Sequence, residues 1–243
     1  MKIFISDSYE SMSKRAANDL KELLQTFTNP LVCTASGDSP AGLYTELVNL
    51  VNHHQMKIAK WNFVGLDEWV GMNGSDEGSC RYYLDKQLFK PLHVDENNIF
   101  FFDGRNNNLQ KECEAVEDFI IRHDGIDVSI VGLGMNGHVG MNEPGTSPAL
   151  HSHVAEIDSV TQQVGQKYFK EKMQLTKGIT LGIANLMEAG HVILLVSGSK
   201  KAAIVKRVLE EEISEQLPAG LLRRHKNLSV YLDAEAVSLL QAK

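Results

Sequence analysis

Cysteine, long apolar runs and an excess of positive charge are scarce or missing in this chain. The three cysteines among its 243 residues show no Cys-x-x-Cys spacing, which argues against a disulfide framework or a zinc cluster and favours reduced thiols. No apolar run approaches the roughly 20 residues of a membrane-spanning helix, and the first residues lack the apolar core of a secretory signal. We therefore expect a cytoplasmic protein that does not interact with a membrane.

The charge balance is acidic, with 24 lysines and arginines against 31 aspartates and glutamates and a net charge of -7. A nucleic-acid-binding protein usually has a basic face, so a nucleic acid is not an expected partner. A small anionic substrate is still compatible with this charge, because a local pocket can be positive within an acidic protein. The 43% hydrophobic and 23% charged residues are ordinary for a globular protein with a buried core.

Segments of strand and helix character alternate along the chain. The expected strands cover residues 3–5, 30–35, 60–66, 98–102, 126–131, 191–196 and 228–232. The expected helices cover residues 14–27, 41–54, 80–89, 108–123, 160–168, 199–213 and 234–240. This order predicts a three-layer α/β fold, a Rossmann-like, mostly parallel sheet with helices on both faces. Since there is no internal repeat and no long linker, residues 1–243 are expected to form a single domain.

Four unusual loops follow predicted strands, at residues 36–40, 67–71, 132–145 and 197–201. In open parallel sheets, ligands bind beyond the carboxyl ends of the strands. We therefore expect these four loops to meet in one cleft.

The glycine-rich loop at residues 132–145 carries the strongest chemical signal. His138 is the best candidate among the nine histidines for a general acid or base, because flexible backbone surrounds it. Glu143 follows five residues later and is close enough to contact the imidazole or the same substrate. Asn136 can hydrogen-bond the ring and orient it.

The same loop contains a formal Gly-x-Gly-x-x-Gly match at residues 132–137. A dinucleotide site needs a helix that begins at this motif and packs through its third glycine. Gly140 and Pro144 oppose such a helix, so a catalytic loop is the better interpretation. No cofactor is expected.

Asp67 and Glu68 directly follow a strand that should be buried. A carboxylate in that position can lose its hydration, which raises its pKa toward the working range of a base. A solvated turn acid is the alternative, and it suits Glu68 better than Asp67. Together with His138 and Glu143, these two carboxylates could also ligate a divalent metal ion. Loss of activity on adding a chelator would test that alternative. We expect metal-free proton transfer.

Two of the loops suit an anion. Ser36, Gly37 and Ser39 lie between a strand and a helix, where free backbone N–H groups and the helix dipole favour a phosphate. Asp38 adds negative charge there, so we expect it to point away or to cap the helix. Lys201 follows another strand at a helix start, where a bound anion explains a lysine better than helix stability does.

Four segments of this sequence resemble the glucosamine-6-phosphate deaminases and the related galactosamine-6-phosphate deaminase/isomerases. They are Leu-Asp-Glu-Trp-Val-Gly at residues 66–71, Gly-Leu-Gly-Met-Asn-Gly-His-Val-Gly-Met-Asn-Glu-Pro-Gly at 132–145, and residues 176–182 and 195–202. The resemblance covers nearly the whole chain in order. The related 6-phosphogluconolactonases share the fold and a Gly-His loop but lack the Asn-Glu-Pro-Gly ending.

The resemblance implies conversion of glucosamine 6-phosphate and water to fructose 6-phosphate and ammonia, without a metal or a cofactor. His138 would assist opening of the pyranose ring with support from Asn136 and Glu143, and Asp67 would move the C2 proton to C1. The 6-phosphate would bind to Ser36, Gly37, Ser39, Lys167 and Lys201. The expected partner is a small amino-sugar phosphate, and the protein would be a monomer or a homo-oligomer.

Two departures from the family pattern matter. The first phosphate loop of the family usually reads Thr-Gly-Gly-Thr-Pro, whereas this chain has Ser-Gly-Asp-Ser-Pro at residues 36–40, with Asp38 at the second glycine. An arginine that other members use on the phosphate corresponds to Lys167, which keeps the charge but loses the bidentate fork. The main alternative is therefore a galactosamine-6-phosphate deaminase/isomerase that yields tagatose 6-phosphate. A 6-phosphogluconolactonase-like hydrolase and a non-catalytic sugar-phosphate sensor are weaker alternatives.

Overall fold

Seven parallel strands form the central sheet of the computed structural model, which describes residues 1–240. In spatial order the strands are β1 (Lys2–Ser6), β10 (Leu228–Asp233), β9 (His191–Val196), β6 (Val128–Gly132), β2 (Leu31–Thr34), β3 (Asn62–Gly65) and β5 (Ile99–Phe100). Each neighbouring pair is parallel. The predicted parallel sheet is thus confirmed.

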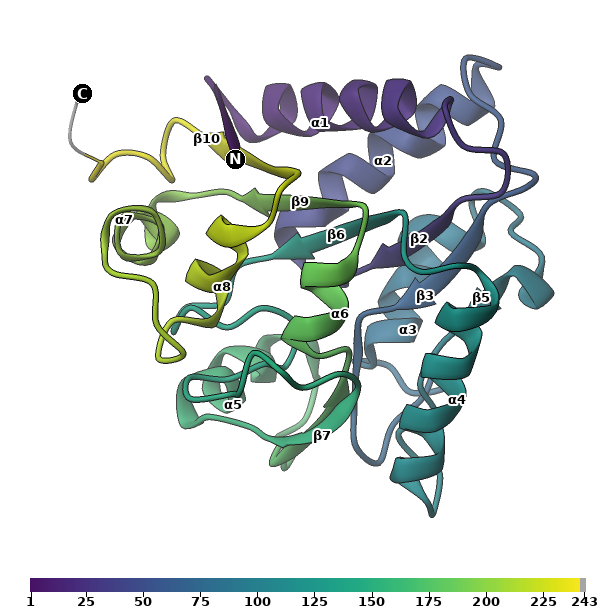
Figure 1. The fold of residues 1–243 in the computed structure, drawn as a ribbon, viewed down its shortest axis with the longest axis vertical. Coiled ribbons are helices and arrows are strands. Elements are labelled where there is room, and N and C mark those ends of the chain that lie inside the picture. Colours follow the sequence, from purple (N-terminus) through teal and green to yellow (C-terminus); the bar gives the residue numbers. More distant parts are fainter. Residues whose placement is uncertain (241–243) are drawn as a thin grey trace.

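Helices cover both faces of this sheet, which gives three layers (Figure 1). One face carries α1 (Tyr9–Leu24), α2 (Asp38–Asn52), and α3 (Cys80–Leu84) with its π-helical continuation η1 (Asp85–Phe89). The other face carries α4 (Leu109–Arg122), α6 (Ile183–Glu188), α7 (Ala202–Glu210) and α8 (Pro218–Leu221). This arrangement confirms the predicted fold class.

The apolar run of β9 follows from its position between the two helical layers. Ile193 and Leu195 pack with α1 and α2, whereas Val192 and Leu194 pack with the helices of the opposite face. Successive side chains of a strand point to opposite faces, so a central strand that is covered on both sides is apolar at nearly every position.

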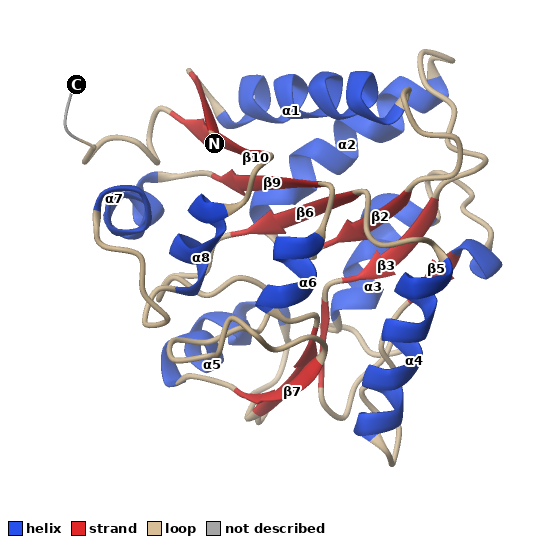
Figure 2. Cartoon of the chain, viewed as in Figure 1, coloured by secondary structure: helices blue, strands red, loops and turns tan. Residues whose placement is uncertain are grey.

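A second, antiparallel sheet was not foreseen from the sequence. It contains β4 (Asp67–Trp69), β8 (Lys177–Thr180) and β7 (His153–Glu156), and lies near α5 (Ser159–Gly165) and the 3₁₀ turn η3 (Gln166–Tyr168) (Figure 2). The chain enters this sheet directly from β3. The Leu66 N–H still bonds to Thr34 at 3.0 Å, but the Leu66 carbonyl accepts from Leu181 at 2.8 Å.

Two helix predictions near the C-terminus were wrong in extent or kind. The helix expected at residues 199–213 begins as a 3₁₀ turn, η4 (Ser199–Lys201), and α7 ends at Glu210. Residues 234–239 form successive turns instead of a helix. The Asp233 carboxylate bonds to the N–H groups of Gly198 and Ala236, which fixes the chain in a turn directly after β10.

The order of the strands creates a crevice between β2 and β6. The chain proceeds from β2 to β3 on one side and from β6 to β9 on the other side. Such a reversal opens a ligand site beyond the carboxyl ends of the two strands. The loops that follow β2 and β6 meet there. Within residues 1–240, no helix has the length and apolarity that crossing a membrane requires.

Candidate active site

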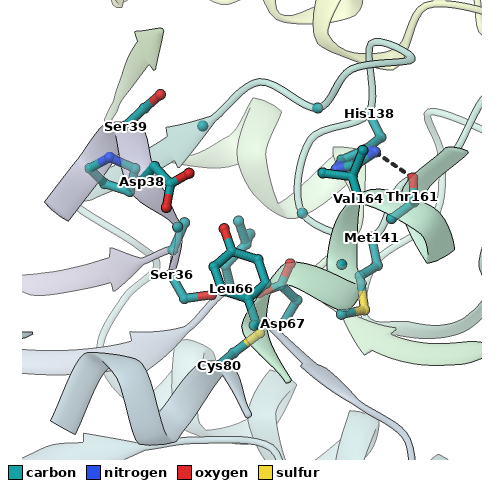
Figure 3. A pocket seen from close by; sticks show the side chains of 18 of the residues that line it. Ser36, Asp38, Ser39, Leu66, Asp67, Cys80, His138, Met141, Thr161 and Val164 are labelled. Carbon is teal, nitrogen blue, oxygen red and sulfur yellow. Dashed lines mark hydrogen bonds between the residues drawn. The ribbon is translucent and has the colours of Figure 1, made fainter. Parts of the chain in front are cut away.

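A cavity occupies the crevice between β2 and β6, and all four predicted loops contribute to its wall. Figure 3 shows Ser36, Asp38 and Ser39 on one side, His138 and Thr161 on the opposite side, and Asp67 between them. We call Asp67, Asn136, His138, Glu143 and Thr161 the proton-transfer end. We call Ser36, Gly37, Asp38, Ser39, Lys167 and Lys201 the anion end.

Asp67 is the first residue of β4, at the point where the chain leaves the main sheet. The residue is only 9% exposed, yet it lines the cavity. Burial raises the pKa of Asp67 to about 6, although a hydrogen bond from the Cys80 thiol and the charge of His138 act in the opposite direction. A carboxylate with this pKa is deprotonated at neutral pH and is a stronger base than an ordinary aspartate.

Glu68 has a different task, and its interpretation as a solvated turn acid was wrong. The residue is 0% exposed. Its carboxylate accepts hydrogen bonds from the N–H groups of Trp69 at 2.8 Å, Cys80 at 2.9 Å and Arg81 at 3.0 Å. Burial nevertheless raises its pKa to about 7. Glu68 therefore joins the start of α3 to β4 and does not line the cavity.

A chain of hydrogen bonds fixes the ring of His138. The Asn136 amide nitrogen donates to Glu143 Oε2 at 2.8 Å, which turns Asn136 Oδ1 toward His138 Nδ1, also at 2.8 Å. An amide oxygen accepts but does not donate, so Nδ1 carries the proton. The other ring nitrogen, Nε2, is left with a lone pair for a ligand. The structure thus brings together the three residues predicted from this loop.

Thr161 belongs to the same chain of hydrogen bonds, and the sequence analysis did not identify it as a site residue. Its hydroxyl lies 2.9 Å from His138 Nδ1 and 3.4 Å from the Asn136 amide nitrogen. Thr161 lies on α5, and no local motif marks it. Only the folding of α5 over the loop after β6 brings this hydroxyl to the ring.

Glu143 is almost fully buried, and one of its carboxylate oxygens lies 3.6 Å from His138 Nδ1. Burial alone would raise its pKa, but the contacts with His138, Asn136 and Thr161 lower the pKa of Glu143 below its usual value. The carboxylate is therefore ionised at neutral pH, and it can stabilise positive charge that develops on the His138 ring.

Close packing requires glycine at two positions of this loop, 134 and 140. A Cβ on Gly134 would lie 2.3 Å from the His138 ring, so a side chain there would displace the imidazole. Gly140 has φ +57, and a Cβ would lie 2.8 Å from Thr180 Oγ1. The loop is therefore shaped around His138, and no helix begins within it.

The anion end begins where β2 leads into α2. Gly37, with φ 122, is the residue before the helix and has no side chain to cap it. The first N–H groups of a helix lack acceptors within the helix, so they can bind an anion. Ser36, Gly37 and Ser39 all line the cavity, and Ser39 Oγ lies 3.4 Å from Ser197 Oγ in the loop after β9.

The sequence predicted that Asp38 would cap α2 or point away from the cavity, and both alternatives were wrong. Its carboxylate forms an ion pair with the Lys167 ammonium, and both residues line the cavity. Partial burial would lower the pKa of Lys167, but the pairing with Asp38 raises it. The two departures from the family pattern are thus in direct contact.

Lys201 is the second cation of the anion end. Its ammonium donates to the Leu133 carbonyl in the loop after β6. Burial, with a smaller repulsion from Lys167, lowers the pKa of Lys201 to about 8. Lys201 is therefore mostly charged at neutral pH and loses its charge a little above it.

Further lining residues were not identified from the sequence. Cys80, Tyr83 and Tyr168 also line the cavity. Tyr83 donates its hydroxyl proton to the Tyr168 carbonyl at 3.1 Å, which ties η3 to α3. In the described part of the chain, no three histidine, cysteine, aspartate or glutamate side chains cluster closely enough to hold a metal ion.

Comparison with known proteins gives one consistent result. The model of a family described as glucosamine-6-phosphate isomerases/6-phosphogluconolactonase matches residues 6–231. A glucosamine-6-phosphate deaminase of Oceanobacillus iheyensis is 35% identical over 238 residues, which cover 98% of this chain and 95% of that protein. One from Clostridium perfringens is 32% identical and covers 99% of this chain and 100% of that protein.

Solved structures agree with these relatives. A monomeric glucosamine-6-phosphate deaminase superposes with a TM-score of 0.95 at 31% identity, covering 98% of this chain and 100% of that one. The 6-phosphogluconolactonase of Trypanosoma brucei has a TM-score of 0.78 at 19% identity, covering 99% and 98% of the two chains. At that identity the likeness concerns the fold alone.

Proposed function

The chain belongs to the family of glucosamine-6-phosphate isomerases and 6-phosphogluconolactonases, and we propose that it converts glucosamine 6-phosphate and water to fructose 6-phosphate and ammonia. The observation that carries this proposal is the pairing of a buried base, Asp67, with a separately oriented His138 in one cavity. A lactone hydrolase needs a group that activates water, but its reaction does not transfer the proton of C2. The deaminase needs both groups.

Ring opening is the first step of the proposed reaction. His138 Nε2 takes the proton of the anomeric hydroxyl and returns a proton to the ring oxygen, which breaks the bond from C1 to that oxygen. Asn136 holds the ring orientation, while the carboxylate of Glu143 stabilises the imidazolium that forms transiently. The open-chain aldehyde results.

Proton transfer between carbons follows ring opening. The carboxylate of Asp67 removes the proton from C2, which the neighbouring C1 carbonyl acidifies, and returns it to C1. The C1 oxygen also gains a proton and the amino nitrogen loses one, so that C1 carries a hydroxyl group and the nitrogen is double-bonded to C2. Water adds to C2 and ammonia leaves, so the products are a ketose phosphate and ammonia. A pKa of about 6 suits Asp67 for accepting and releasing the same proton near neutral pH.

The substrate phosphate would occupy the anion end. The N–H groups at the start of α2 and the hydroxyls of Ser36 and Ser39 can bind its oxygens, with Gly37 allowing close approach of the backbone. Lys167 and Lys201 supply positive charge. We further propose a cytoplasmic enzyme that is one functional domain and acts as a monomer or a homo-oligomer.

One assay tests the function. The purified protein is incubated with glucosamine 6-phosphate and, separately, with its galacto epimer, and released ammonia is measured. We expect ammonia from glucosamine 6-phosphate together with an equal amount of fructose 6-phosphate. Ammonia from neither sugar would overturn the proposal. A higher kcat/KM for the galacto epimer would instead assign a galactosamine-6-phosphate deaminase that forms tagatose 6-phosphate.

A further inference from the structure

The anion end contains a carboxylate, Asp38, whose negative charge disfavours binding of a phosphate. Asp38 is the first residue of α2, so its side chain stands at the positive end of the helix dipole, where an anion is stabilised. The same carboxylate pairs with Lys167 of η3. One negative group of the protein thus lies in the first turn of α2 and pairs with one of the two lysines that line this end of the cavity.

This ion pair is accessible and able to rearrange. The side chain of Asp38 is 74% exposed and that of Lys167 is 46% exposed. Exposed ion pairs are weak, because water solvates the separated charges almost as well. The segment of Lys167 is anchored elsewhere, through the hydrogen bond from Tyr83 to the Tyr168 carbonyl at 3.1 Å and through two hydrogen bonds between the Gln166 side chain and the Met173 backbone, at 2.8 and 3.0 Å. Lys167 can therefore release Asp38 while η3 stays in place.

We propose that Asp38 is an internal competitor of the substrate phosphate and that Lys167 exchanges the carboxylate for the phosphate when the substrate binds. This inference rests on the proposed function, because it takes a sugar phosphate as the occupant. The exchange reduces what Lys167 contributes to affinity, since one ion pair is lost as another forms. Lys201 has a different contact, since its ammonium donates to the Leu133 carbonyl.

A double-mutant cycle on Asp38 and Lys167 tests the exchange. Binding of fructose 6-phosphate is measured by calorimetry at pH 7 and low salt for the wild type, Asp38→Asn, Lys167→Met and the double variant. We expect Asp38→Asn to lower Kd about two- to fivefold. Lys167→Met should raise Kd about twofold when it is introduced into the wild type. Introduced into the Asp38→Asn variant it should raise Kd at least about fivefold, because Lys167 has no carboxylate partner there before phosphate binds.

Glu77→Gln is the matched control. It removes an exposed carboxylate from another ion pair on the same segment, with Lys170, outside the cavity lining. We expect its Kd to equal that of the wild type. An equal gain in affinity from Glu77→Gln and Asp38→Asn would reduce the effect to net charge and overturn the proposal.

The cycle separates this inference from the proposed function, because binding is measured without turnover. Equal costs of Lys167→Met in both backgrounds, weaker binding by Asp38→Asn, or no binding by any of the four proteins would overturn the exchange. Unequal costs in the expected sense support it, whether or not the wild type releases ammonia from glucosamine 6-phosphate.

Discussion

The two ends of the cavity are built in different ways. At the proton-transfer end, partly or fully buried groups hold one another through short hydrogen bonds, from Glu143 through Asn136 to His138. At the anion end, Asp38 and Lys167 are exposed, line the cavity and pair with each other. Proton transfer needs reacting atoms fixed within tenths of an ångström, whereas phosphate binding tolerates a long, mobile lysine. Substitutions at the first end should thus affect kcat, and those at the second should affect KM.

The largest loss is expected for Asp67→Asn. Without its base, kcat should fall about 10³-fold, because proton transfer by a positioned side chain contributes on that order. Exchange of the C2 proton with deuterated solvent, followed by NMR, should stop, while binding of fructose 6-phosphate is largely retained. Continued exchange at the wild-type rate would show that Asp67 is not the base.

The same substitution should stabilise the fold at neutral pH. Folding raises the pKa of Asp67 from 3.8 to about 6, so the charged carboxylate destabilises the folded state relative to the protonated form. The stability associated with protonated Asp67 is fully present below pH 3.8 and is lost as the pH rises through about 6. At pH 7.5, Asp67→Asn should therefore raise the free energy of unfolding by on the order of 2 kcal/mol.

Glu68→Gln is the paired control for this stability effect. Its amide would place a donor against one of the backbone N–H groups that Glu68 accepts from, which should cost about 1–3 kcal/mol. This cost offsets the gain from removing a carboxylate whose pKa burial raises to about 7. Urea titration at pH 7.5 should therefore show a smaller gain for Glu68→Gln than for Asp67→Asn, and an equal or larger gain would contradict the different tasks assigned to these neighbouring carboxylates.

His138→Gln should produce the next largest loss, about 10²-fold in kcat, because it removes the group that we propose opens the ring. The loss should be smaller for a 5-deoxy analogue of the substrate, which cannot close the pyranose ring. Turnover of the two substrates by wild type and variant gives the comparison. Equal losses on both would contradict a ring-opening role.

Lys201 should affect KM in a pH-dependent manner. Since burial lowers its pKa to about 8, the ammonium loses its proton between pH 7 and 9, and KM for glucosamine 6-phosphate should rise over that range. Lys201→Met should raise KM about tenfold at pH 7 and abolish the further rise. A KM that is constant with pH in the wild type would exclude Lys201 from the phosphate site.

The smallest effect is expected for Cys80→Ala. The Cys80 thiol donates to Asp67 and holds its pKa lower than burial alone would. Its removal should shift the acid limb of kcat, expected near pH 6, upward by a fraction of a pH unit. Saturating substrate limits interference from the phosphate, which also titrates near pH 6. Cys113→Ala, a buried cysteine outside the cavity lining, should leave the limb unchanged.

Much of the architecture could be predicted because it depends on local patterns. The apolar run of β9 indicates a strand covered on both faces, and glycines around His138 indicate a loop that cannot become a helix. The second sheet could not be predicted in this way. Its strand β4 is three residues long and continues from β3, so the division between two sheets leaves no mark in the local pattern.

The sequence by itself determined which residues stand at the carboxyl ends of the strands, since strand, loop and helix signals are short-range. It thereby placed Asp67 and His138 at the site. Only the tertiary structure decided that Glu68 binds backbone amides, that Thr161 contacts His138, and that Asp38 pairs with Lys167, 129 positions away. The physical reason is that burial and pairing set what a charged side chain does, and both arise only when distant segments pack together.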